Sequence, residues 1–297
     1  MEKEKNFNFN SLIGQPRSEN AVIEELQKDP ASYQKFRSFP SRYRQEIIDF
    51  LCGSRGLDIL YDSFFQHVMN PETHRDRLEG LISCLLGQPV QILTPLPREG
   101  EQLADSGSFV VMDILVRLTD QSIINIEMQK IGYQFPEQRA ICYLSDVIMR
   151  EYNRLRSERQ KHFTYQDLAP VYLFIIMENS PEAFRDVPAY IHRRQVSYDS
   201  GVLLPGIEHI TYISLDKFRE TVHHIGNELD AWLTFFSTTE PKRIIELVDR
   251  YPAFADYYRD IALFRRNPKE LINMFSEALA IMDRNTERLM VTELQEQ

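Results

Sequence analysis

The sequence predicts a mixed α/β fold, a β-sheet core between helical flanks, from the order of its apolar patterns. Helical periodicity fills most of residues 21–87, and short runs rich in Val and Ile lie between 109 and 215. One long helical pattern, 138–160, interrupts those runs, and a helical pattern resumes at Asp216. This order is typical of a sheet covered by helices.

We expect three parts along the chain, which need not be independent domains. They are an N-terminal arm and helical extension at residues 1–57, the α/β core at 58–215, and a C-terminal helical region at 216–297. The first boundary follows the break GSRGLD, where Gly and Ser interrupt the helical pattern.

The individual helices are predicted from apolar spacing. The segment NPETHRDRLEGLISCLLG repeats Leu and Ile at i, i+3, i+4 and i+7 and ends at a glycine. LYDSFFQHVM is expected to be a shorter helix with Asp62 as its cap. KELINMFSEALAIMDR, near the C-terminus, is the clearest amphipathic helix.

The strands are predicted from short apolar runs. An extended region begins with PVQILTPLP. The strand candidates are GSFVVMDILVRLT, SIINIEMQKI, PVYLFIIM and HITYISL.

Composition excludes several classes of protein. No apolar run approaches 18 residues, so no membrane span is expected. The N-terminal residues lack the apolar stretch of a secretory signal, and the 3 cysteines are scattered without a CxxC pair. These features favour a reducing compartment, and we expect a cytoplasmic protein. The net charge of −10 means that any binding of nucleic acid must use local basic patches or a metal ion that offsets the acids.

Two acids stand in the middle of neighbouring apolar runs, Asp113 in VVMDILVRL and Glu127 in SIINIEMQ. The polar stretch TDQS separates the runs, so we expect a β-hairpin with its turn centred on Asp120. That register places Asp113 directly opposite Glu127, with Cβ atoms about 5 Å apart on one face. Gln129, two residues further on, points to the same side. A register slip of one residue would undo this opposition.

Two carboxylates this close repel each other and raise one pKa unless a cation lies between them. Mg²⁺ prefers oxygen ligands and usually takes one or two protein carboxylates while keeping several waters. A bound metal can activate water and stabilise charge on a phosphoryl oxygen, so the pattern indicates phosphodiester hydrolysis. The alternative is that both acids lie on the solvent face of an antiparallel sheet.

The segment around these acids resembles a known motif. Asp113, thirteen further residues and then Glu127-Met128-Gln129 give a D…ExQ pattern similar to that of the PD-(D/E)XK nucleases. The neighbouring segments resemble the PD-(D/E)XK nuclease family transposases and the related recombination-promoting nucleases over roughly residues 45–235. The segments that carry the resemblance are YDSFFQHVM, LEGLISCLLG, INIEMQKIGYQFPEQRAICYLSDVIMREY and PVYLFIIM.

The resemblance implies a restriction-endonuclease-like core, a central mixed sheet flanked by helices. It also implies a Mg²⁺-dependent endonuclease, with Mn²⁺ as a substitute, that acts on DNA and is linked to mobile elements or recombination. Asp113 and Glu127 would be the metal ligands, with the Met128 carbonyl as a further one. Gln129 would orient the attacking water or a phosphate oxygen.

Gln129 departs from the usual pattern, which has Lys at this place. A lysine supplies positive charge and can help to generate hydroxide, whereas glutamine only donates and accepts hydrogen bonds. If this chain cleaves DNA, the metal must supply nearly all of the charge stabilisation.

Other residues are weaker candidates. Nucleases of the fold that the resemblance implies often take an extra metal ligand from the first core helix, for which Glu79 and Asp62 are candidates. The alternatives are a solvated helix residue for Glu79 and a helix cap for Asp62. Arg139 and Tyr143 are four residues apart on one helix face, where Arg139 could bind the scissile phosphate or pair with a carboxylate of the sheet.

The helix end REYNRLRSERQKH carries five Lys or Arg against two Glu. Its residues Arg150 and Arg154 could track a DNA backbone. The alternative is that basic residues are simply favoured at a helix C-terminus by the macrodipole.

Three hypotheses follow for function. The first is the metal-dependent DNA endonuclease, the second a degenerate nuclease fold that binds DNA or protein, and the third an RNA substrate in place of DNA. A homodimer is plausible by analogy with the fold, because a double-strand cut needs two sites.

Overall fold

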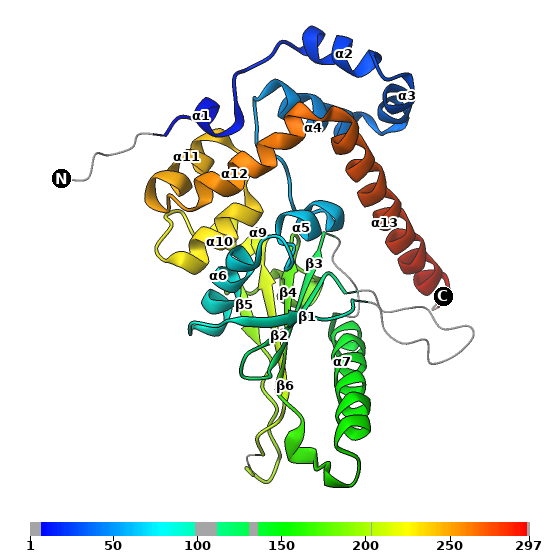
Figure 1. The fold of residues 1–297 in the computed structure, drawn as a ribbon, viewed down its shortest axis with the longest axis vertical. Helices are drawn as coiled ribbons and strands as arrows, with labels where there is room; N and C mark the ends of the chain where they lie inside the picture. The colour runs from blue at the N-terminus through cyan, green and yellow to red at the C-terminus, as the bar shows by residue number, and fades with distance from the viewer. Residues whose placement is uncertain (1–6, 99–111, 131–135, 203, 296–297) are drawn as a thin grey trace, which may run out of the picture. The chain divides into compact units, whose positions relative to one another are not determined.

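The structure, a computed structural model, describes residues 7–98, 112–130, 136–202 and 204–295, with side chains as far as Ile281. The chain divides into two compact units (Figure 1). Residues 69–223 form the first, here called the sheet unit, and residues 1–68 with 224–297 form the second, here called the helical unit. The predicted division of the chain into three parts, at residues 57/58 and 215/216, is not tested by these two units and remains a prediction.

The sheet unit is built on a mixed six-stranded sheet in the order β1-β2-β3-β4-β6-β5. β1, β2 and β3 are antiparallel, β3, β4 and β6 are parallel, and β5 is antiparallel to β6. The strands are β1 (Ile92–Pro95), β2 (Ile114–Leu118), β3 (Ile123–Gln129), β4 (Val171–Met177), β5 (Ile191–Arg193) and β6 (Glu208–Ser214).

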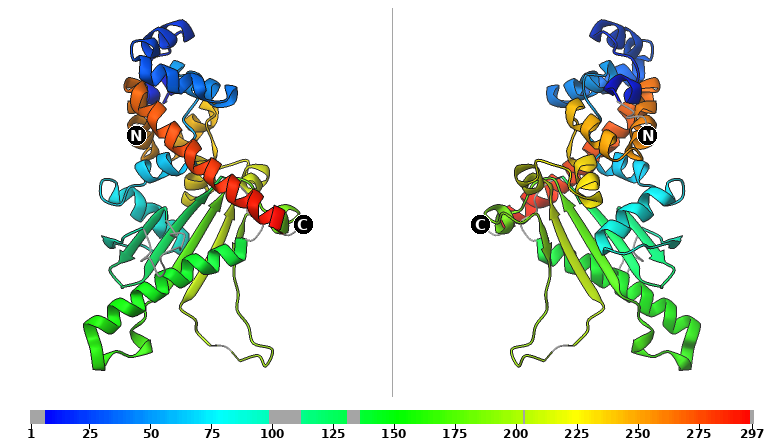
Figure 2. Two further views of the ribbon diagram at one scale, coloured as in Figure 1. Left: turned by 90° about the vertical axis from the view of Figure 1, so that its right-hand side faces the viewer. Right: turned by 90° about the vertical axis from the view of Figure 1, so that its left-hand side faces the viewer.

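The helix α7 (Pro136–Arg159) connects β3 to the parallel strand β4 and lies across one face of the sheet (Figure 2). A parallel pair requires such a crossover connection, and a helix is the usual form of it. The remaining helical elements of this unit are α6 (Arg75–Leu86), η1 (Gln160–His162), η2 (Tyr165–Asp167), α8 (Glu182–Arg185) and α9 (Leu215–Thr221).

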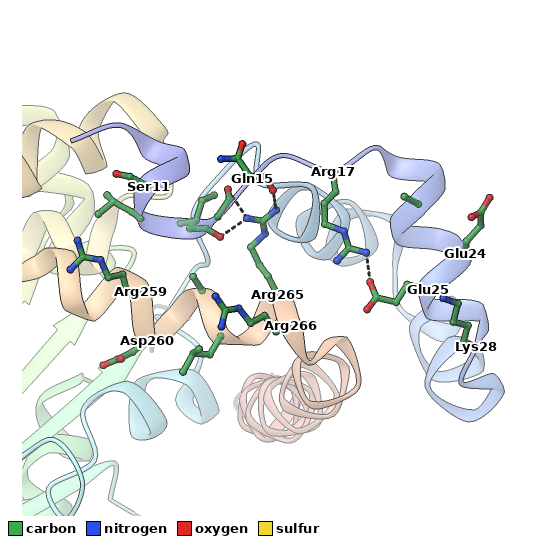
Figure 3. A pocket seen from close by; sticks show the side chains of 16 residues that line it. Ser11, Gln15, Arg17, Glu24, Glu25, Lys28, Arg259, Asp260, Arg265 and Arg266 are labelled. Atoms are coloured by element: carbon green, nitrogen blue, oxygen red, sulfur yellow. Dashed lines mark hydrogen bonds and ion pairs between the residues drawn. The ribbon is translucent and has the colours of Figure 1, made fainter. Parts of the chain in front are cut away.

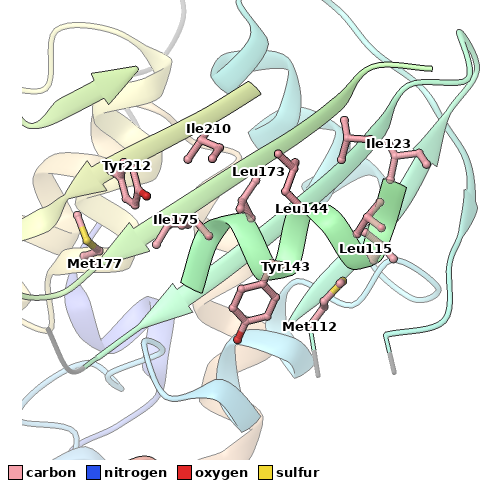
Figure 4. Close-up of a cluster of buried hydrophobic side chains, with 13 residues drawn as sticks. Met112, Leu115, Ile123, Tyr143, Leu144, Leu173, Ile175, Met177, Ile210 and Tyr212 are labelled. Atoms are coloured by element: carbon pink, nitrogen blue, oxygen red, sulfur yellow. The ribbon is translucent and has the colours of Figure 1, made fainter. Parts of the chain in front are cut away.

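One hydrophobic core lies between α7 and the sheet (Figure 4). Leu115, Ile123, Leu173 and Ile210 contribute to it from four different strands, and Leu144 contributes from α7. Every residue of β2 and β3 is buried.

Most of the predicted elements are present. The expected helix at 138–160 is α7, and PVYLFIIM and HITYISL contain β4 and β6. Residues 107–111 of the candidate GSFVVMDILVRLT lie outside the described residues, and β2 begins at Ile114. β5 was not predicted, because three half-exposed residues are too few to show a periodic pattern.

The helical unit joins segments from both ends of the chain. Pro30, at the start of α3, and Pro40, the cap of α4, separate the N-terminal helices, as expected of a residue that lacks an amide donor. The elements are α1 (Phe9–Ile13), α2 (Glu19–Gln27), α3 (Pro30–Ser38), α4 (Ser41–Cys52), α5 (Asp62–Val68), α10 (Glu228–Ser237), α11 (Pro241–Arg250), α12 (Phe254–Ala262), η3 (Leu263–Arg266) and α13 (Pro268–Gln295).

Arg265 connects those two ends. Its buried guanidinium donates hydrogen bonds to the carbonyls of Ile13, Gly14, Gln15 and Leu51 (Figure 3). It also lines a pocket of about 890 Å³ formed by α1, α2, α12 and η3. None of the helices in the described ranges is long and apolar enough to cross a membrane.

Candidate functional site

The β2–β3 hairpin brings Asp113 next to Glu127. The strands pair from Arg117 with Ile123 to Ile114 with Ile126, which is the predicted register. The ladder ends there, and Asp113, the residue before Ile114, lies close enough to Glu127 for its negative charge to act on the Glu127 carboxyl. The Met128 amide donates a hydrogen bond of 2.7 Å to the Asp113 carboxylate, which fixes that carboxylate against β3.

The turn of the hairpin lies where the sequence predicts it. Gln121 has a left-handed backbone with φ of 73°, and its amide donates to the Leu118 carbonyl at 3.0 Å. The Asp120 carboxylate accepts from the Ser122 amide at 3.0 Å, as Asp commonly does within turns. These local bonds fix the register, and the register places the acids.

The two acids lie on the face of the sheet that packs against α7. Side chains alternate along a strand, so Glu127 and Gln129 face the same side as Ile123, which packs in the core beneath α7. Asp113, Glu127 and Gln129 are 9%, 3% and 6% exposed. The alternative that both acids lie on a solvent face is therefore wrong.

Burial raises the pKa of Glu127 well above its ordinary value, and the negative charge of Asp113 raises it further. The positive charge of Arg139 on α7 acts in the opposite direction and lowers the pKa of Glu127. A side-chain hydrogen bond with Asn125 and a backbone hydrogen bond with Asp113 also lower the pKa of Glu127. The Glu127 Oε1 atom is buried, and none of the residues that the structure describes donates a hydrogen bond to it. The buried Oε1 atom is the part of the carboxylate at which a cation could bind.

These features fit a hard divalent cation. Such ions prefer oxygen ligands, and the site offers two adjacent carboxylates with one oxygen that has no hydrogen-bond partner among the described residues. Within the part of the chain that the structure describes, no group of three or more His, Cys, Asp or Glu is placed to hold a metal ion. A cation here would therefore rely on two carboxylates and complete its shell with waters, as Mg²⁺ commonly does.

The two weaker acid candidates occupy other places. Glu79 lies on α6, and its carboxylate accepts a 2.7 Å hydrogen bond from the Ile92 amide at the start of β1. Asp62 is the first residue of α5 and belongs to the helical unit. Metal binding by either remains a prediction.

Arg139 and Tyr143 lie near the start of α7. The Arg139 guanidinium donates to the Tyr143 hydroxyl at 2.5 Å and lies over its ring, 5.1 Å from the centroid. Tyr143 is part of the core beneath the helix. The charge of Arg139 lowers the pKa of Glu127, so the guanidinium acts electrostatically on the acid pair.

Arg150 and Arg154, further along α7, are engaged within the chain. Arg150 pairs with Asp146 at 3.0 Å and donates to the Pro97 carbonyl at 2.7 Å. Arg154 pairs with Glu151 at 2.8 Å and with Glu158 at 2.7 Å. Phosphate binding by these two residues remains a prediction, and it would have to share or replace those pairs.

Two polar residues on the acid face were not predicted from the sequence. Arg117 forms a buried two-bond pair with Glu151 of α7, at 3.0 and 2.7 Å. Asn125, buried beside Glu127, points to the same side. Side chains two or four residues apart on a strand point to the same side. Asn125 is two residues before Glu127 and Arg117 is four residues after Asp113, so the alternation that placed Gln129 could also have placed these two residues.

Comparison with known proteins assigns the chain to a family whose expected fold agrees with the sheet and helices described above. A family model described as PD-(D/E)XK nuclease family transposase matches residues 59–288, which is most of the chain. The mixed sheet with flanking helices is the restriction-endonuclease-like α/β fold expected for that family. No curated protein and no solved structure matches the chain.

Proposed function

Because the chain belongs to the PD-(D/E)XK nuclease family transposases, we propose that it is a divalent-metal-dependent endonuclease that hydrolyses phosphodiester bonds in DNA. One observation carries the proposal: Asp113 and Glu127 are both buried at the same end of the hairpin, and within the described residues one buried oxygen of Glu127 has no hydrogen-bond partner. The family also supports a link to mobile elements or recombination.

In this proposal, Asp113 and Glu127 hold Mg²⁺, for which Mn²⁺ can substitute, and the Met128 carbonyl is a further candidate ligand. The bound ion would supply an activated water and would stabilise negative charge on a phosphoryl oxygen. The Gln129 amide, on the same face, orients the water or a phosphate oxygen by hydrogen bonding. Arg139 holds the phosphate with its charged guanidinium.

A plasmid-nicking assay with Mg²⁺ or Mn²⁺ tests the reaction. Wild-type protein should convert supercoiled DNA to the nicked form, and Asp113→Ala and Glu127→Ala should abolish this conversion. Asp199→Ala is the matched control, since it removes an exposed acid from the same unit. Equal nicking by all four proteins would show that the acid pair is not the active site.

A second measurement tests the cation without any DNA. Added Mg²⁺ should raise the melting temperature of wild-type protein, because a ligand that binds only the folded state stabilises it. Glu127→Gln keeps the shape but removes the charge, so it should show no Mg²⁺-dependent shift. A shift of equal size in Glu127→Gln would remove Glu127 from the metal site.

The alternative function is a catalytically degenerate nuclease fold that binds DNA or a protein partner. Gln129 in place of lysine and the net charge of −10 favour it. It predicts tight binding of DNA or a protein partner, and no metal-dependent cleavage in the nicking assay.

Two further properties belong to the proposal. Cleavage of duplex DNA, single-stranded DNA and RNA under one set of conditions would separate a DNA substrate from an RNA substrate. A homodimer would supply the two sites that a double-strand cut needs, and light scattering would measure it.

A further inference from the structure

The far end of α7 carries a group of aromatic and basic side chains that the proposed reaction does not use. We define this aromatic–basic patch as Tyr152, Arg156, Lys161, Phe163 and Tyr165. Figure 2 shows α7 running on to this end of the sheet unit, where η1 and η2 follow it. The patch is unusual in a chain with a net charge of −10.

A tight turn assembles the patch. α7 ends at Arg159, and Gln160 takes up a left-handed backbone with φ of 48°, which reverses the chain into η1. The Asp167 carboxylate then accepts a 2.7 Å hydrogen bond from the Thr164 amide and pairs with Arg159. These bonds hold the returning segment against the last turns of α7.

The three rings contact one another in a fixed arrangement. Phe163 packs edge-on against Tyr152 with centroids 5.4 Å apart, and against Tyr165 at 5.6 Å. Tyr152 and Tyr165 are nearly parallel, 12° apart in plane, at 6.3 Å. A ring held in this way loses little conformational freedom when a ligand stacks on it, which lowers the entropic cost of binding.

The patch is open to solvent on its outer side. Tyr165 is 74% exposed, and Arg156 and Lys161 are exposed as well. The Arg156 guanidinium lies 5.6 Å from the centroid of the Tyr152 ring. Within the described ranges Lys161 has no carboxylate in ion-pair distance, so its charge is available to an anion.

From this arrangement we infer that the patch binds single-stranded DNA, an inference that rests on the proposed function for its choice of DNA. An unpaired base exposes a π-face that stacks on an aromatic side chain, and the adjacent phosphates attract nearby cations. A duplex buries its base faces within its own stack. Exposed rings beside cations therefore favour a single strand over a duplex.

The patch is separate from the acid pair. Tyr152 follows Arg139 by thirteen residues on the same helix, which corresponds to roughly 20 Å at 1.5 Å per residue. Changes in the patch should therefore affect the binding of DNA and leave the acids themselves unchanged.

Fluorescence anisotropy with labelled oligonucleotides tests the inference on the full-length chain. The protein carries Asp113→Ala, so that cleavage does not affect the measurement, and the probes are a single strand and the duplex of the same sequence. Tyr165→Ala should weaken single-strand binding by at least about fivefold, the lower limit for loss of one stacked base. Tyr165→Trp should keep the affinity, and the duplex should respond less than twofold.

Tyr198→Ala is the matched control, because Tyr198 is also a tyrosine of the sheet unit and is 48% exposed. It should bind the single strand as the parent does. Lys161→Glu is an independent variant that should weaken binding and reduce its salt dependence. Melting curves confirm that each variant is folded.

Several outcomes would overturn the inference: no binding of the single strand, equal affinities in Tyr165→Ala and Tyr198→Ala, or equal losses on strand and duplex. A Tyr165-dependent loss with RNA alone would also overturn it. The nicking assay separates this result from the proposed function. If wild-type protein nicks DNA but Tyr165→Ala does not change single-strand binding, only the inference about the patch is rejected. If Tyr165→Ala weakens binding but wild-type protein does not nick DNA, only the proposed nuclease function is rejected.

Discussion

At the scale of single residues, the buried pair of Arg117 and Glu151 holds α7 over the acids. The two hydrogen bonds are parallel, which is the strongest form of this contact, and Arg154 adds a second cation to Glu151. Burial alone would raise the pKa of Glu151. The hydrogen bonds and charges of Arg154 and Arg117 outweigh burial and lower that pKa to about 2.

Glu151 should therefore contribute to stability in a pH-dependent way. A folded-state pKa below the unfolded value means that the contribution is complete above about pH 4.5 and is lost as the pH falls towards 2. Glu151→Gln should lower the free energy of unfolding at pH 7 by about 3 kcal/mol, since it leaves the buried guanidinium of Arg117 without its carboxylate partner. Urea titrations at several pH values should show this difference shrinking below pH 4. A difference that stays constant down to pH 2 would contradict the assignment.

Arg265 gives a second prediction at this scale. Its donors satisfy four backbone carbonyls, three of them in residues 13–15. Arg265→Met should lower the free energy of unfolding by about 3 kcal/mol or more, because several buried acceptors lose their donors. Arg266→Met, at the exposed neighbouring position, should change it by less than about 0.5 kcal/mol. Equal effects of the two variants in chemical denaturation would contradict the role of Arg265.

At the scale of elements, the hairpin turn can be strengthened. Gln121 has a left-handed backbone, which costs a residue with a Cβ about 1 kcal/mol and costs glycine little. Gln121→Gly should raise the free energy of unfolding by up to about 1 kcal/mol, whereas the β-branched Gln121→Val should lower it. Urea denaturation measures the free energy of unfolding of both variants. A Val variant as stable as the Gly variant would show that position 121 does not require a residue suited to a left-handed backbone.

The elements that local pattern controls could be predicted. The position of TDQS was enough to predict the register of the hairpin, and helical periodicity was enough for α7. Which face of the hairpin lies on the side of α7 could not be predicted. That depends on where α7 packs on the sheet, a contact between segments that no local pattern encodes.

At the scale of the whole molecule, the chain ends belong to one unit. α1 contacts α11 and α12, and α3 and α4 contact α13, although more than 200 residues separate them in sequence. Such pairing leaves no local signal, so it could not be predicted from the sequence. The covered position of the acids and the charge of Arg139 beside them have the same kind of long-range origin.

A truncation tests this arrangement. Deletion of residues 1–57 removes the carbonyls that Arg265 binds and the helices that α12 and α13 contact. Residues 224–281 should then become sensitive to a low concentration of protease, which mass spectrometry of the fragments detects. A deletion of residues 1–6 is the control. Unchanged protease resistance after the longer deletion would show that the C-terminal helices fold without their N-terminal partners.

The hydrogen bond from the Met128 amide to Asp113 has a practical consequence. The Met128 amide nitrogen lies 2.7 Å from the Asp113 carboxylate oxygen that accepts its proton. The NMR chemical shift of this amide is therefore sensitive to the charge on the carboxylate. Met128 therefore provides a built-in spectroscopic probe of the acid pair. Selective ¹⁵N labelling of methionine would reduce the spectrum to the amides of the 9 methionines, and a Met128→Leu variant would identify the signal of Met128. Titrating a cation would then report occupancy of the site before any substrate is known.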